Sequence, residues 1–165
     1  MDTSERRFEE EIEYALLNSG YKKGNAKDYN KELAMDTKEV LNFIQDTQPY
    51  EWELLTKKHG ALVEQNFFKR LDNELKRRGM LDVLRHGIDD TGVSFKLSYF
   101  KPGSTMNKTA TALYEKNQLM ITRQIYYSLD NKNSIDTVIF LNGLPIITIE
   151  LKNPLTGQTV EDAIR

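Results

Sequence analysis

The chain has 165 residues, of which 39% are hydrophobic and 29% are charged, and its formal net charge is −2. This composition is typical of a soluble globular domain rather than a disordered chain, and the absence of cysteine excludes a disulfide framework and a cysteine-ligated zinc site. No apolar run reaches the length of a membrane span and the N-terminus lacks the features of a signal peptide, so we expect a cytoplasmic protein without a membrane partner.

An opening helix is predicted within residues 1–20. Gly20 ends it, and apolar residues recur before it at helical spacing: Phe8, Ile12, Ala15 and Leu16. The polar stretch that follows, residues 22–31, is typical of a loop.

A helical insertion is predicted from about residue 29 to about residue 86. Asp36 is a good N-cap for a helix that stops before Pro49, and a short helix is expected near residues 51–58. A long amphipathic helix then begins at about Ala61 and ends at Gly79.

From about residue 92 to residue 165 the pattern changes to that of a sheet. The stretch "GVSFKLSYF" alternates as a strand does, and "QLMITRQIYYSL" reads as a second strand after a polar connector. Two apolar runs around Asn142-Gly143 then predict a hairpin, and a final helix begins at about Thr159. We therefore expect one α+β domain, truncated before its fold is complete.

Charged residues interrupt this apolar hairpin: Asp136 opens the first strand, and Glu150 and Lys152 close the second. A two-residue turn at Asn142-Gly143 would place Asp136 opposite Ile149, with Glu150 on the other face. A three-residue loop, or a single β-bulge, would instead pair Asp136 with Glu150. The Asn-Gly dipeptide favours the first register and the clustering of charge favours the second.

Neighbouring carboxylates at Asp136 and Glu150 would repel one another, and a divalent hard cation would remove that repulsion. Mg²⁺ takes one or two carboxylates together with water and substrate phosphate oxygens, and it activates a bound water. Lys152 could stabilise charge on the phosphate during attack. The sequence thus points to phosphodiester hydrolysis, with the ordinary strand-end salt bridge as the alternative.

Basic residues concentrate in the middle of the chain. Residues 66–132 contain 12 basic and 7 acidic residues, a balance of +5. Contact with DNA phosphates is one interpretation and a solvated helix face is the other. The candidate DNA-binding residues are Arg70, Lys76, Arg77, Arg78, Lys101 and Lys108.

Asp136, thirteen intervening residues and then Glu150-Leu151-Lys152 resemble the D…E-x-K core of PD-(D/E)xK nucleases. The longer text "NSIDTVIFLNGLPIITIELKNP" with "TVEDAIR" is similar to the N-terminal nuclease domain of the R subunit of type I restriction enzymes. The opening "FEEEIEYALLNSGY", "NFIQDTQPYEW" and "NQLMITRQIYYS" extend the resemblance over nearly the whole chain.

The resemblance implies a restriction-endonuclease-like, RecB-like fold, with a central mixed sheet flanked by helices. It implies that Asp136, Glu150 and the Leu151 carbonyl bind Mg²⁺, with Mn²⁺ as a substitute, and that Lys152 is catalytic. Double-stranded DNA, methylation and specificity subunits, and motor domains C-terminal to this chain are the implied partners, in a bacterial or archaeal cytoplasm. ATP would be used by the full-length subunit and not bound here, since no Walker A motif is present.

Glu9 resembles the opening-helix glutamate of the RecB-like branch and is a possible accessory acid, with an exposed helix face as the alternative. RecB-like members continue into a Q-x-x-x-Y motif where this chain ends, at Arg165, so we expect the isolated chain to be less than a complete nuclease. A non-catalytic module that docks DNA or partner subunits on the same fold is the alternative function.

Overall fold

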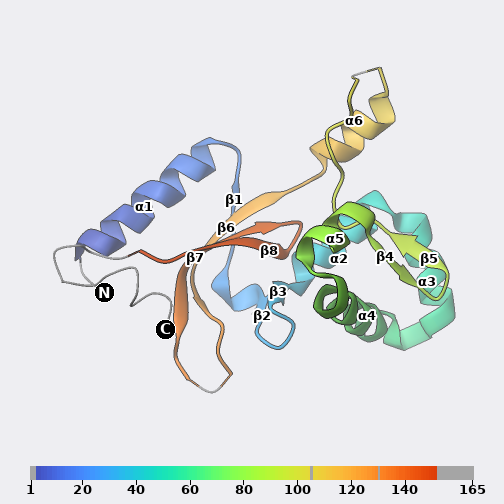
Figure 1. Ribbon diagram of the computed structural model, residues 1–165, viewed down its shortest axis with the longest axis horizontal. Coiled ribbons are helices and arrows are strands. Elements are labelled where there is room, and N and C mark those ends of the chain that lie inside the picture. The colour runs from blue at the N-terminus through green and yellow to red at the C-terminus, as the bar shows by residue number, and fades with distance from the viewer. Residues whose placement is uncertain (1–2, 105, 130, 152–165) are drawn as a thin grey trace.

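The computed structural model describes residues 3–104, 106–129 and 131–151 (Figure 1). Six α-helices are present among these residues: α1 (Thr3–Asn18), α2 (Thr37–Thr47), α3 (Pro49–His59), α4 (Val63–Arg78), α5 (Met80–His86) and α6 (Lys108–Glu115). The strands are β1 (Lys22–Lys23), β2 (Tyr29–Asn30), β3 (Met35–Asp36), β4 (Ile88–Asp90), β5 (Val93–Phe95), β6 (Leu119–Tyr126), β7 (Ser134–Leu141) and β8 (Leu144–Ile149). Two short 3₁₀ turns are η1 (Ala26–Asp28) and η2 (Gly60–Leu62).

The central sheet has the strand order β1-β6-β7-β8. Strand β1 runs parallel to β6, whereas the pairs β6–β7 and β7–β8 are antiparallel, so the sheet is mixed as expected. A small apolar cluster of Met120, Ile125, Val138 and Phe140 packs against η1 and β2. Figure 1 shows α1 on one side of the sheet and helices α2 to α5 grouped on the other.

The helical insertion forms where the capping residues predict it. The Asp36 side chain accepts a hydrogen bond from the Glu39 amide at 3.0 Å and so caps α2. Proline at the first position of α3 is compatible with a helix start, and Gly79 ends α4 with φ of +83°. These are the boundaries expected from the sequence, within one or two residues.

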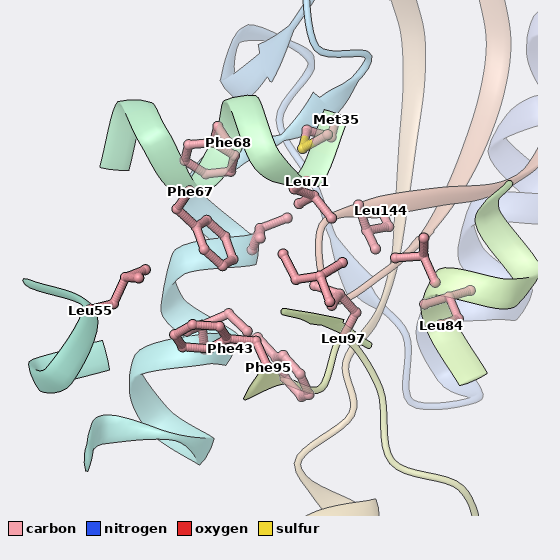
Figure 2. Close-up of a cluster of buried hydrophobic side chains, with 14 of the residues drawn as sticks. Met35, Phe43, Leu55, Phe67, Phe68, Leu71, Leu84, Phe95, Leu97 and Leu144 are labelled. Atoms are coloured by element: carbon pink, nitrogen blue, oxygen red, sulfur yellow. The ribbon is translucent and has the colours of Figure 1, made fainter. Parts of the chain in front are cut away.

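The largest core lies inside the helical insertion rather than under the sheet. Phe67 is fully buried at its centre, with the ring of Trp52 at 5.4 Å and that of Phe95 at 5.4 Å, both edge-on. Leu144 of β8 is also fully buried in this cluster, which Figure 2 shows. The sheet is therefore attached to the insertion through a shared core.

Strand β5 departs from the sequence-based expectation. Residues from about 92 were predicted to open the central sheet, but β5 pairs with β4 in a separate two-stranded sheet. Its residues Val93 and Phe95, and Leu97 beyond its end, are buried in the core of the insertion. The alternation reported correctly that one face is apolar, but it could not identify which core covers that face.

Several elements were missed, namely helices α5 and α6 and the short strands β1 to β4. Strand β1 lies in the stretch predicted as a loop; it has only two residues, both exposed, and it is held by pairing with β6. Helix α6 lies in the predicted connector, where the Asn107 side chain caps it by accepting from the Ala110 amide at 3.0 Å. No helix of the described residues is both long enough and apolar enough to cross a membrane.

The tip of the β7–β8 hairpin is docked onto the helical insertion. Asn142 and Gly143 both have positive φ, +52° and +85°, as a two-residue type I′ turn requires. The Asn142 amide nitrogen Nδ2 donates to the Leu97 carbonyl at 2.9 Å, and its Oδ1 accepts from the Gln118 amide at 2.7 Å. The Gly143 carbonyl in turn accepts a hydrogen bond from the Asp36 amide at 2.9 Å.

Gly143→Ala is expected to destabilise the protein more than Gly92→Ala. A Cβ at Gly143 would lie 2.5 Å from the Asp36 carbonyl oxygen and 2.6 Å from the Val40 nitrogen, whereas a Cβ at Gly92 would meet nothing within 4 Å. Both glycines have similar positive φ, so each substitution carries a backbone cost of about 1–2 kcal/mol. Only Gly143→Ala should add a packing cost of about 1–3 kcal/mol.

Urea unfolding of the two variants and the parent measures this difference. Equal losses of unfolding free energy for Gly92→Ala and Gly143→Ala would show that the hairpin tip is not tightly docked.

Candidate active site

The hairpin register combines the two arrangements that the sequence left open. Leu141 pairs with Leu144 across the two-residue turn, but a bulge follows, so that Thr137 pairs with Ile149. The ladder ends at this pair, and continuing its register by one residue would set Glu150 opposite Asp136. The two-residue turn predicted from Asn-Gly is confirmed, and the bulge is the kind of irregularity that the clustering of charge favoured.

Both carboxylate oxygens of Asp136 accept hydrogen bonds. The Leu151 amide donates to Asp136 Oδ2 at 2.7 Å, which brings the backbone after β8 against the carboxylate. The Gln124 side chain donates from Nε2 to Asp136 Oδ1 at 3.4 Å. Asp136 as a whole is half-buried.

Glu9 of α1 joins the same cluster. Its side chain is fully buried, so the alternative of an exposed helix face is wrong for this residue. Arg123 of β6 donates from Nε to Glu9 Oε2 at 3.0 Å, and Gln124 donates from Nε2 to Glu9 Oε1 at 2.9 Å. Glu9 is thus connected to Asp136 through one side chain, that of Gln124.

A second glutamate of α1 extends the cluster. Glu13 is 8% exposed and pairs with Lys23 at 3.1 Å and with Arg123 at 3.4 Å. Arg123 therefore lies between the carboxylates of Glu9 and Glu13, and each of these two carboxylates forms an ion pair with a cation from the sheet. Buried charge of this kind is tolerated only when it is paired and hydrogen-bonded.

The buried face of α1 differs from the predicted apolar stripe. Glu9, Ile12, Glu13 and Leu16 follow the i, i+3, i+4, i+7 spacing of one helix face, and all four are buried or half-buried. Phe8 is 53% exposed. The hydrophobic pattern failed here because the facing strand presents Arg123, which requires acidic partners.

Gln124 has an unusual backbone, with φ of +54° inside a strand. Consecutive residues of a regular strand point to opposite faces, yet Arg123 and Gln124 both reach Glu9. Sequence reasoning missed both residues. The available signal was the polar Arg-Gln pair in the middle of the otherwise apolar "LMITRQIY".

The donor set fits a hard divalent cation. Asp136, Glu150 and the Leu151 carbonyl would supply oxygen ligands, and Mg²⁺ characteristically uses one or two carboxylates and fills its remaining positions with water and phosphate. No group of three or more His, Cys, Asp or Glu side chains suited to a metal occurs within the described ranges. Lys152, the predicted catalytic lysine, lies outside the described residues.

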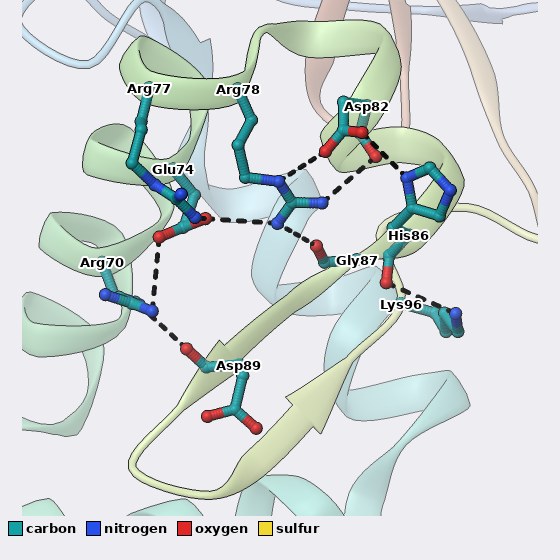
Figure 3. Close-up of polar contacts among 9 residues, drawn as sticks. All are labelled: Arg70, Glu74, Arg77, Arg78, Asp82, His86, Gly87, Asp89 and Lys96. Atoms are coloured by element: carbon teal, nitrogen blue, oxygen red, sulfur yellow. Dashed lines mark hydrogen bonds and ion pairs between the residues drawn. The ribbon is translucent and has the colours of Figure 1, made fainter.

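The candidate DNA-binding arginines of α4 form a network around Glu74, shown in Figure 3. Buried Glu74 pairs with Arg70 at 3.3 Å, with Arg77 at 2.6 Å and with Arg78 at 3.2 Å. Arg78 also pairs with Asp82 of α5 and donates to the Gly87 carbonyl at 2.9 Å. Because Arg78 is only 20% exposed, its evident role is to join α4 to α5.

The other basic candidates are more accessible. Lys76 is 71% exposed and pairs with Asp72 at 2.6 Å, and the Arg77 side chain is 67% exposed. Lys101 and Lys108 are exposed beside α6. Figure 1 shows α4 within the helical insertion and α1 at the opposite end of the molecule, so the α4 basic residues are not adjacent to Glu9.

A family model described as Type I restriction enzyme R protein N terminus (HSDR_N) matches residues 2–165. The match spans α1, the helical insertion and the hairpin that carries Asp136. No curated protein matches the chain, and no solved structure does.

Arg77→Gln is expected to destabilise the protein at neutral pH and much less in acid. The hydrogen bond from Arg77, more than any other contact, holds the pKa of the Glu74 carboxyl below its usual range. A depressed folded pKa contributes stability above the unfolded value of about 4.3, and that stability is lost as pH falls through the folded pKa. Urea unfolding from pH 7 to pH 3 measures the difference between variant and parent.

Lys69→Gln is the matched control, because Lys69 is exposed on the same helix and has no ion pair among the described residues. It should change stability little at any pH. A deficit for Arg77→Gln that stays constant down to pH 3 would show that the arginine does not act through Glu74.

Proposed function

The chain belongs to the family of type I restriction enzyme R protein N termini, and we propose that it is the magnesium-dependent DNA endonuclease domain of such an enzyme. The observation that carries the proposal is the β-bulge in the hairpin, because the register after it, continued by one residue beyond Thr137 and Ile149, would set Glu150 opposite Asp136. A β-bulge changes the direction in which the following side chains point and locally disrupts the hydrogen bonds between the strands. Bulges are over-represented next to active sites.

The fold proposed for this domain is the restriction-endonuclease-like, RecB-like PD-(D/E)xK fold. Its support is the opening helix α1 against a mixed sheet, followed by the D…E-x-K spacing on the β7–β8 hairpin. The burial of Glu9 next to this hairpin agrees with an accessory acid on the opening helix.

In this proposal Asp136, Glu150 and the Leu151 carbonyl hold Mg²⁺, for which Mn²⁺ can substitute. The bound ion supplies Lewis-acid chemistry at a phosphate oxygen and at a water molecule. Asp136 is held for this role by the Leu151 amide. Hydrolysis joins the water oxygen to phosphorus and releases one ester oxygen, and the Lys152 ammonium would stabilise the negative charge that grows on the phosphate.

The proposed context is an ATP-dependent complex. The R subunit would act on double-stranded foreign DNA together with methylation and specificity subunits, and its motor domains, C-terminal to this chain, would bind ATP. The chain itself shows no Walker A sequence. Sequence recognition would then lie in another subunit, and this domain would need to bind the DNA backbone only.

Lys152→Ala, made in the whole R protein within its complex, is expected to abolish DNA cleavage and to spare ATP hydrolysis. Loss of one preorganised charge at the reacting phosphate costs about 10²-fold or more in rate. Asp136→Ala should also abolish cleavage, but raised Mg²⁺ should restore part of the activity only for Asp136→Ala. Plasmid cleavage and ATP hydrolysis are measured in parallel.

Cleavage at the parental rate by either variant would remove the nuclease assignment and favour the docking module. Loss of ATP hydrolysis together with cleavage would instead indicate that the substitution disrupts the structure or assembly.

The exposed basic residues are proposed to contact DNA phosphates, and a salt titration tests them. The double variant Lys76→Gln/Arg77→Gln and the double variant Lys101→Gln/Lys108→Gln avoid Arg78, whose contacts join two helices. Because Arg77 also pairs with Glu74, urea unfolding must show that the first variant is folded under the binding conditions. Each phosphate contact that is lost should reduce the slope of log K against log salt by about 0.9.

Lys57→Gln is the control, since Lys57 forms an exposed ion pair with Glu53 on α3. If a double variant retains the slope of the parent and of Lys57→Gln, the corresponding residues form only a solvated face.

A further inference from the structure

We propose that Gln124 is a positioning residue that orients the Asp136 carboxylate for its cation. The proposal rests on the proposed metal role of Asp136 and adds a residue to that site. Gln124 contacts Asp136 Oδ1 at 3.4 Å and Glu9 Oε1 at 2.9 Å, in both cases from the same nitrogen, Nε2. Gln124 thereby connects Glu9 of α1 to the strand that carries Asp136.

The two carboxylates determine the orientation of the Gln124 amide. Ionised carboxylates only accept hydrogen bonds, so the amide must present its NH₂ group, and not its oxygen, to both Glu9 and Asp136. An NH₂ group has two hydrogens, one for each partner. The pairing therefore uses the full donor capacity of the nitrogen and leaves the reverse orientation unfavourable.

Arg123 keeps this arrangement from becoming a repulsive cluster of acids. Its guanidinium lies 3.0 Å from Glu9 Oε2, on the oxygen that Gln124 does not use. Glu9 is fully buried and would be costly to desolvate without such a partner. Arg123 thus fixes Glu9, Glu9 fixes the amide of Gln124, and the amide reaches Asp136.

The backbone of Gln124 is consistent with a functional constraint. A φ of +54° is unfavourable for a residue with a side chain, and such conformations concentrate at active sites. At this position the left-handed backbone lets Gln124 share the face that Arg123 occupies. A regular strand would point its amide away from Glu9.

The consequence for Asp136 is a carboxylate fixed at both oxygens. Oδ2 accepts from the Leu151 amide at 2.7 Å and Oδ1 accepts from Gln124, so rotation of the carboxylate would break both contacts. Each carboxylate oxygen has two lone pairs, and one on each remains for a cation. Hydrogen bonds that orient a ligand in this way typically change metal affinity or activity by about 10–100-fold.

Gln124→Asn separates positioning from folding. Asparagine tolerates positive φ better than glutamine does, so the backbone is retained. Its amide is one methylene shorter and cannot reach both carboxylates as the glutamine amide does. Mn²⁺ binding to the whole R protein, measured by calorimetry without DNA or ATP, is expected to weaken about 10-fold or more. Urea unfolding checks that the variant remains fully folded under the conditions of the binding measurement.

Ala34→Asn is the matched control, because Ala34 also has positive φ, +53°, in an exposed turn between β2 and β3. It should leave Mn²⁺ binding unchanged. Asp136→Ala identifies which calorimetric component belongs to this site, and if it removes none, the metal assignment of the proposed function fails. If Asp136→Ala removes a component and Gln124→Asn binds Mn²⁺ like the parent, the positioning role of Gln124 alone is overturned.

Discussion

The docked turn at Asn142-Gly143 is the constraint on which the rest of the structure depends. Asn142 is 2% exposed and is bonded to the backbone of Leu97 and Gln118, which come from the segments before and after α6. Gly143 accepts from Asp36 at the start of α2. One two-residue turn therefore joins the sheet to the helical insertion, and no residue with a larger side chain would fit at Gly143 without displacing the backbone of α2.

The docked tip also explains why a bulge is needed. With Leu141 paired to Leu144, a regular ladder would set Asp136 opposite Ile149 and would turn Glu150 to the other face. Because the turn cannot be lengthened without losing its contacts, the register must change within the strands. The bulge near Ile139 and Phe140 makes this change between the fixed tip and the charged end. A single extra residue thus keeps the packed tip in place and changes the register at the charged end of the hairpin.

The features predicted best from the sequence were those that depend on a few neighbouring residues, such as the ends of helices. Asp36, Pro49 and Gly79 mark helix ends through capping and backbone geometry, and the helices begin and end beside them. Prediction from the sequence failed where the structure of a segment depends on the distant segment that it packs against or pairs with. Val93 and Phe95 showed an apolar face but not the core that covers it, and β1 exists only because β6 pairs with it. In the candidate site, the spacing of Asp136 and Glu150 was visible, whereas the contacts of Gln124 depend on a left-handed residue that no pattern indicates.

The charged interface between α1 and the sheet is difficult to explain by stability alone. Glu9 and Glu13 lie where a helix usually places leucine, and a buried ion pair is often no more stabilising than apolar residues of similar size. A fold that required only a packed opening helix could use Ile12 and Leu16 with further apolar neighbours. Instead, Arg123 and Gln124 each donate to one carboxylate oxygen of Glu9, and Gln124 also donates to Asp136. The buried charges of Glu9 and Arg123 are therefore connected, through Gln124, to the carboxylate of half-buried Asp136. This is the arrangement expected if the interface was selected to orient that carboxylate.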